Sequence, residues 1–165
     1  MNSPRFRVEW LDGSLDRSGF DCGTPALDHY FHAQVMQDIK RRMATCFVAR
    51  GEAGEIAGYY TLSAASVMLT QLPALVVKKL PRYPSVPVVR MGRLAVDRRF
   101  KGLGLGAALL FDALSRTARS DIAAYALLVD AKDEAAAAFY RHHGFMAFEQ
   151  QALTLYLPLA TVRGI

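Results

Sequence analysis

The sequence predicts a mixed α/β domain with one central sheet. Two observations lead to this prediction. Apolar, strand-like runs alternate along the chain with segments of helical periodicity, and a glycine-rich turn joins an apolar strand to an amphipathic helix. At 165 residues the chain is long enough for one sizeable core, so we expect a single domain over residues 1–165.

A helix and a hairpin are the first elements expected. Thr24 and Pro25 are typical of a helix start with proline at the first helical position, and apolar residues then recur at helical spacing over residues 25–40. The strand-like runs 45–49 and 56–62 enclose a short turn-rich insert, which predicts a β-hairpin.

The middle of the chain predicts a strand–helix–strand unit. Residues 67–79 are expected to form a short helix and the proline-containing segment 80–87 a loop. A strand over residues 88–96 then enters the glycine-rich turn. Helical spacing from Gly104 and a strand over residues 124–129 complete the unit.

A last helix and two closing strands are expected near the C-terminus. Asp133 is a suitable N-cap for a helix over residues 134–143, and Gly144 marks its end. Residues 145–146 and 153–157 supply the closing strands.

Composition restricts the possible partners. Twenty Lys and Arg against 15 Asp and Glu give a formal charge of +5, which suits an anionic ligand but does not separate a nucleotide cofactor from a nucleic acid. The chain shows no signal-peptide pattern and no run of about 18 apolar residues, so we expect a cytoplasmic protein without a membrane segment. Cys22 and Cys46 lack metal-site spacing, which favours two buried thiols and no metal.

The strongest chemical signal is the loop that runs from Arg99 to Gly106. Alternating glycines allow successive backbone N–H groups to face one point, and the following helix adds its unpaired amides, so a diphosphate fits there. No GK[ST] follows, and the acidic ribose partner of a dinucleotide site is lacking. The alternative reading is a tight strand-to-helix turn. The predicted phosphate-binding residues are Arg99, Lys101, Gly102, Leu103, Gly104, Leu105 and Gly106.

The motif R-x-x-G-x-G between strand and helix resembles the acyl-CoA loop of the GNAT acetyltransferases, and further segments resemble the GNAT toxins of bacterial toxin–antitoxin pairs. The segments that carry this closer resemblance are Phe20-Asp21-Cys22-Gly23, Leu27-Asp28, Gly58-Tyr59-Tyr60-Thr61-Leu62-Ser63, Leu80-Pro81-Arg82-Tyr83-Pro84, Gly92-Arg93-Leu94-Ala95-Val96, Val129-Asp130-Ala131 and Ala138-Phe139-Tyr140.

This resemblance implies the GNAT fold, in which a central mixed, mostly antiparallel sheet is flanked by helices and the strands splay at the CoA site. It also implies acetyl-CoA as acetyl donor. It also implies transfer of the acetyl group to the α-amine of aminoacyl-tRNA, which blocks translation. The implied partners are a ribbon-helix-helix antitoxin, operator DNA bound only through that antitoxin, and a second copy of the chain in a homodimer. Which aminoacyl-tRNA is used stays open.

The resemblance also assigns site residues. Tyr140 matches the catalytic tyrosine, and the backbone of Leu94, Ala95 and Val96 matches the strand that holds the pantetheine arm. Asp130 and Phe139 fall in matching segments and are expected at the cofactor. A phenol with a pKa near 10 is protonated at neutral pH and suits proton donation to the leaving thiolate. Without the resemblance, Tyr140 reads as a half-buried aromatic that packs the last helix on the sheet.

Basic clusters are candidate contacts for the tRNA phosphates, although a solvated surface explains any single one of them. Period-2 alternation places Arg90 and Arg93 on opposite sides of their strand unless Gly92 introduces a bulge, which we predict. The candidates are Lys40, Arg41, Lys78, Lys79, Arg82, Arg90 and Arg93.

Two other functions compete with aminoacyl-tRNA acetylation. One is acetylation of a small amine or a protein N-terminus by the same fold. The other is a non-catalytic CoA-binding subunit, which binds acetyl-CoA but transfers nothing. An α-amine with a pKa of about 8 has a sizeable neutral fraction at physiological pH, which favours α-amines over lysine side chains as the nucleophile. No carboxylate on the strand over residues 88–96 suits a general base, and the role of base stays open.

Overall fold

The computed structural model describes residues 5–162 and separates the chain into two compact units. The first unit comprises Met1–Ser63 and Gly92–Ala113, and the second comprises Ala64–Met91 and Leu114–Ile165. The expectation of a single domain over residues 1–165 stays a prediction. Among the described residues no helix is long and apolar enough to cross a membrane.

The strands confirm the predicted mixed, mostly antiparallel sheet. Over the described part of the chain their order is β1-β2-β3-β4-β5-β7-β6, with β4 and β5 parallel and the pairs β1/β2, β2/β3, β5/β7 and β6/β7 antiparallel. Both β3 and β4 run through the two units. The strands are β1 (Arg7–Trp10), β2 (Thr45–Arg50), β3 (Ile56–Met68), β4 (Ser85–Val96), β5 (Ala126–Asp130), β6 (Met146–Phe148) and β7 (Gln151–Pro158).

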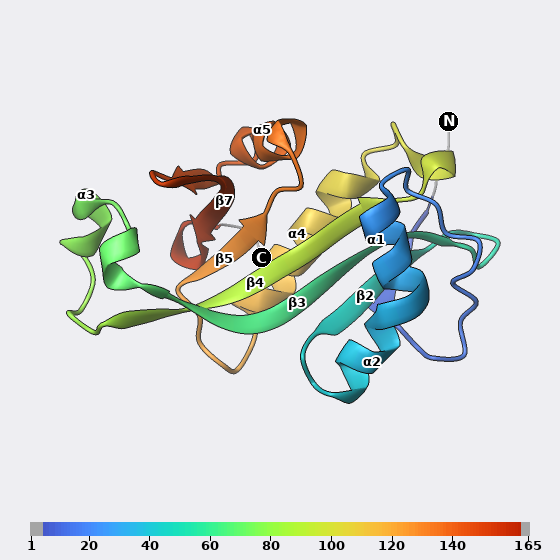
Figure 1. The fold of residues 1–165 in the computed structure, drawn as a ribbon, viewed down its shortest axis with the longest axis horizontal. Coiled ribbons are helices and arrows are strands. Elements are labelled where there is room, and N and C mark those ends of the chain that lie inside the picture. The colour runs from blue at the N-terminus through green and yellow to red at the C-terminus, as the bar shows by residue number, and fades with distance from the viewer. Residues whose placement is uncertain (1–4, 163–165) are drawn as a thin grey trace. The chain divides into compact units, whose positions relative to one another are not determined.

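In the first unit, helices cover both faces of the sheet (Figure 1). Tyr59 of β3 stacks on Phe31 with ring centroids 4.3 Å apart, while the neighbouring Tyr60 donates a hydrogen bond to Asp112 of helix α4 (Leu105–Ala118). Successive strand residues point to opposite faces, so the helical segment over residues 25–40 and the start of α4 lie on opposite sides of β3.

The predicted helix over residues 25–40 is confirmed, with one irregularity. It is α-helical at α1 (Pro25–His29) and α2 (Val35–Lys40), and the connecting turn η1 (Tyr30–Gln34) is π-helical. Arg17 donates from Nε to the carbonyl of Phe31 within this turn, at 2.9 Å. Thr24 is the N-cap residue and Pro25 follows at the start of the helix, as predicted, although the Thr24 side chain makes no capping hydrogen bond.

The second unit contains its own apolar core around β4, β5 and β7. Val88, Ala126, Leu128 and Tyr156 belong to this buried cluster. Helix α5 (Glu134–His142) begins as predicted, since the side chain of Asp133 accepts from the Ala136 amide at 2.8 Å.

Residues 67–79 depart from the predicted helix. Strand β3 continues to Met68, a 3₁₀ turn η2 (Leu69–Gln71) follows, and the helix α3 covers only Ala74–Val77. Burial of Val67 in the second core extends the strand, and Pro73, the N-cap of α3, lacks the N–H that a continuous helix needs.

Two further expectations were incomplete. Residues 85–87 belong to β4 rather than to the loop, because Val86 is buried in the second core. The short strand β1, whose exposure does not alternate, was missed. Further 3₁₀ turns are η3 (Arg98–Phe100) and η4 (Leu159–Thr161).

Candidate functional site

The glycine-rich loop of the first unit forms an open backbone cradle. Gly102 and Gly104 have φ angles of +80° and +78°, a region that glycine adopts at little cost. A Cβ atom added at either glycine would meet no atom within 4 Å. The glycine conformations at these two positions lead the backbone into the N-terminus of α4, whose first-turn amides have no intrahelical partner. Unpaired amides next to a helix N-terminus suit an anionic group such as a diphosphate.

The cationic side chains of the loop bind the protein itself. Lys101 donates from Nζ to the carbonyl of Cys22 at 2.8 Å, and Arg99 donates from Nε to Asp97 at 3.0 Å. Arg98 pairs with Asp21 at 3.3 Å. The Arg99 and Lys101 side chains, which the sequence suggested as phosphate ligands, therefore already help to hold the loop.

Asp97 lies at the base of the loop, and its side chain is almost completely buried, with 1% of the residue exposed. It accepts from the backbone amides of Arg99 and Asp21 at 2.9 and 3.1 Å. Burial acts to raise the pKa of this carboxyl, but the hydrogen bonds from Arg99 and Asp21 outweigh it and hold the pKa below its ordinary value. A carboxylate occupied by so many donors is a poor general base.

Strand β4 runs directly into this loop. Its residues Leu94, Ala95 and Val96 are the predicted pantetheine-holding segment, and the Ala95 side chain is buried. Gly58 of β3 permits close packing here, because a Cβ at that position would lie 2.9 Å from the Ala95 carbonyl and 2.8 Å from Leu109.

Tyr140 lies in the second unit, on α5. Its ring packs against Phe139 and Phe145, with centroids 5.3 and 5.6 Å away, and only 5% of the residue is exposed. Burial, with a smaller contribution from the charge of Asp130, raises the pKa of the Tyr140 hydroxyl above its ordinary value. The hydroxyl therefore stays protonated at physiological pH, as a proton donor must.

Asp130 and Arg90 form an ion pair that was not anticipated. They come from the parallel neighbours β5 and β4, and Arg90 donates to the Asp130 carboxylate at 2.6 Å. Arg90 was expected at the tRNA and Asp130 at the cofactor. In the structure the two side chains bind each other, with 40% and 38% of each exposed.

Arg93 of the first unit has a different environment from Arg90. Its guanidinium carbon lies 3.4 Å from the ring centroid of Tyr30, a cation–π contact, and the Tyr30 hydroxyl donates to Asp38 at 2.8 Å. Sequence reasoning missed Tyr30, because an aromatic at helical spacing reads as core. The bulge at Gly92 stays a prediction.

The remaining basic candidates are exposed. Lys40 and Arg41 lie at the end of α2 in the first unit, and Lys78, Lys79 and Arg82 follow α3 in the second. Their convergence on one ligand stays a prediction.

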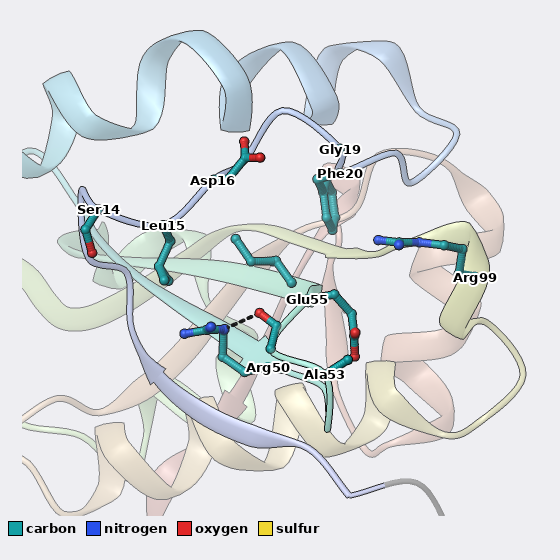
Figure 2. Close-up of a pocket in the computed structure, with 11 residues that line it drawn as sticks. Ser14, Leu15, Asp16, Gly19, Phe20, Arg50, Ala53, Glu55 and Arg99 are labelled. Atoms are coloured by element: carbon teal, nitrogen blue, oxygen red, sulfur yellow. Dashed lines mark hydrogen bonds between the residues drawn. The ribbon is translucent and has the colours of Figure 1, made fainter.

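Beside the loop, the first unit contains a pocket of about 430 Å³ that sequence reasoning did not find (Figure 2). The 14–20 segment, the turn of the β2–β3 hairpin and Arg99 line it. Two cations, Arg50 and Arg99, and two carboxylates, Asp16 and Glu55, give it mixed charge. Over the described residues no cluster of three or more His, Cys, Asp and Glu is placed to hold a metal.

A comparison of the sequence with known protein families identifies a family that agrees with this fold and this loop. Residues 8–145 match the model described as the Acetyltransferase (GNAT) family. The chain belongs to this family and is an acetyltransferase that takes its acetyl group from acetyl-CoA.

Particular relatives are similar along nearly the whole chain. The chain is 35% identical over 152 residues to the tRNA-acetylating toxin of Mycobacterium tuberculosis (strain ATCC 25618 / H37Rv), covering 91% of this chain and 90% of that protein. The structure of AtaT complexed with acetyl-methionyl-tRNAfMet superposes with a TM-score of 0.87 at 28% identity, covering 95% and 96%. A mutant AtaT toxin bound to the C-terminus of the antitoxin AtaR gives 0.79 at 25% identity, covering 94% of each chain.

Proposed function

We propose that this acetyltransferase is a toxin that acetylates the α-amine of aminoacyl-tRNA and so blocks translation. The observation that carries the proposal is the 35% identity to a tRNA-acetylating toxin, which extends over about nine-tenths of both chains. The similarity to AtaT complexed with an acetylated aminoacyl-tRNA supports the same substrate. Because charged tRNA is the substrate, the activity belongs in the cytoplasm.

The glycine-rich loop and the end of β4 form the proposed acetyl-CoA site. The backbone amides of residues 101–104 bind the pyrophosphate together with the α4 N-terminus, where Leu105 and Gly106 add first-turn amides and the positive dipole end. The backbone of Leu94, Ala95 and Val96 holds the pantetheine arm. Asp130 and Phe139 flank the cofactor, as the resemblance implies.

Tyr140 is the proposed general acid. The neutral α-amine attacks the thioester carbonyl and forms the C–N bond. As the C–S bond breaks, the leaving sulfur takes a proton from the Tyr140 hydroxyl, and the proton that the amine nitrogen loses restores the phenol. The raised pKa keeps the hydroxyl proton in place until the thiolate, a stronger base than the ground-state thioester, develops. Within residues 5–162 the hydroxyl has no hydrogen-bond partner of its own, which leaves it available to the substrate.

The proposed partners follow from the same relatives. A ribbon-helix-helix antitoxin neutralises the chain, and the antitoxin rather than the toxin binds operator DNA. The active form is a homodimer. The proposed contacts to tRNA phosphates are the exposed cations Lys40, Arg41, Lys78, Lys79 and Arg82, together with Arg90 and Arg93.

Expression in a bacterial host tests this function. We expect the wild-type chain to arrest growth, with N-acetylated aminoacyl-tRNA detectable by mass spectrometry, and co-expression of the antitoxin to relieve the arrest. Unimpaired growth at a confirmed protein level, with no acetylated tRNA, would instead favour a small amine or protein N-terminus as acceptor.

A further inference from the structure

The segment Asp21–Gly23 is joined to the glycine-rich loop by several contacts. Arg98 donates its backbone N–H to the carbonyl of Asp21 at 2.9 Å, and the side chains of the two residues pair at 3.3 Å. Lys101 reaches the carbonyl of Cys22 at 2.8 Å. A segment that is 76 to 79 residues away in sequence therefore supports one side of the loop.

Asp97 is the centre of this arrangement. Its backbone N–H donates to the carbonyl of Ala57 in β3 at 2.8 Å, which fixes the start of the loop to the sheet. Its carboxylate then joins the Asp21–Gly23 segment to the turn at Arg98–Phe100. Oδ2 accepts from the Asp21 amide, and Oδ1 accepts from the Arg99 amide and guanidinium. With 1% of the residue exposed, water cannot replace these bonds.

The support continues into the first helix. The amide of Cys22 donates to the side chain of Asp28 in α1 at 2.8 Å. Gly23 has a φ of +88°, a backbone conformation that favours glycine, and it lies against the Arg98 side chain, where a Cβ would be 3.0 Å from Nε.

We propose that Asp97 is a positioning residue for acetyl-CoA: its buried carboxylate fixes the Asp21–Gly23 segment and the turn at Arg98–Phe100 so that the amides of residues 101–104 face the pyrophosphate. The inference rests on the proposed use of this loop for the pyrophosphate, and not on the identity of the acceptor. Asp97 does not touch the reacting atoms.

The electrostatic effect of Asp97 has the opposite sign, which makes the proposal testable. A carboxylate near an anion site repels a pyrophosphate, and it also occupies Arg99. If Asp97 acted only through its charge, Asp97→Asn would strengthen acetyl-CoA binding. If Asp97 acts by positioning, the same variant weakens acetyl-CoA binding. The single side-chain oxygen of asparagine cannot accept all the hydrogen bonds that the two carboxylate oxygens accept, and its NH₂ group would face the donors that one of those oxygens now binds.

Calorimetric titration of acetyl-CoA into the full chain separates these outcomes. We expect Asp97→Asn to raise the Kd about 10-fold or more, and to raise the KM for acetyl-CoA while kcat stays within about twofold. Val48→Ala, which truncates a fully buried residue of the same unit, serves as the control for lost stability. It is expected to lower Tm but to leave the Kd unchanged.

An unchanged or lower Kd for acetyl-CoA in Asp97→Asn would overturn the proposal. So would a rise in this Kd that is no larger than the rise in Val48→Ala, if the two variants lose equal Tm. Either result leaves aminoacyl-tRNA acetylation untouched. Conversely, a wild-type chain that binds acetyl-CoA but does not acetylate tRNA would refute the proposed function, while the Kd ratio would still decide the role of Asp97.

Discussion

Replacing Tyr140 by phenylalanine is expected to lower kcat for acetyl transfer about 10²-fold to 10⁴-fold, the usual contribution of a general acid. The change removes only the hydroxyl, and the ring keeps its packing against Phe139 and Phe145. We therefore expect the Kd for acetyl-CoA and the Tm to stay close to those of the wild type. Single-turnover kinetics with charged tRNA would measure the chemical step.

Tyr156→Phe is the matched control. Tyr156 is also buried in the second unit, and its hydroxyl has no hydrogen-bond partner among the described residues. Loss of that hydroxyl is expected to leave kcat unchanged and stability equal or slightly higher. A Tyr140→Phe enzyme with wild-type kcat would exclude the tyrosine as the acid and require another proton donor.

Substitution of Gly104 by alanine is expected to have the next largest effect, on acetyl-CoA binding. Alanine at a φ of +78° costs about 1–2 kcal/mol, which corresponds to roughly a 5-fold to 30-fold change in an equilibrium. Because the added Cβ meets no protein atom within 4 Å, the cost comes from the backbone conformation alone, and it favours loop conformations other than the one that binds. The KM for acetyl-CoA should rise accordingly, as steady-state kinetics would show.

Gly144→Ala imposes the same kind of backbone strain elsewhere. Gly144 has a φ of +93° after α5, and its Cβ would lie at an ordinary 3.8 Å from Leu157. We expect Gly144→Ala to lower the Tm without a change in the KM for acetyl-CoA. Equal KM values for the two variants would argue that the glycine-rich loop does not bind the cofactor.

The local sequence pattern was sufficient to predict most of the helices and strands. Helix α5 was predictable because Asp133 and Gly144 mark its two ends in sequence, and the hairpin was predictable from its turn. Residues 67–79 were not, because the burial of Val67 against distant strands decides between strand and helix there. The π-helical turn at Tyr30–Gln34 also depends on a distant partner, Arg17.

The candidate site divides in the same way. Glycine adopts positive φ angles at little cost, so the role of the loop glycines was predictable from the sequence. The roles of Asp97 and Asp130 were not, because each depends on a partner that only the fold brings close, the Asp21 amide for one and Arg90 for the other. Likewise, spacing along β4 gave no sign that Arg93 stacks on Tyr30.

The most direct test of the central claim is to incubate the purified chain with labelled acetyl-CoA and total charged tRNA, and to follow the label into the RNA fraction. Deacylated tRNA and free amino acids are the controls. We predict label in charged tRNA alone, lost on mild alkaline deacylation as an N-acetyl amino acid. Absence of label from RNA, with CoA released on free amines or peptides, would contradict aminoacyl-tRNA as the acceptor.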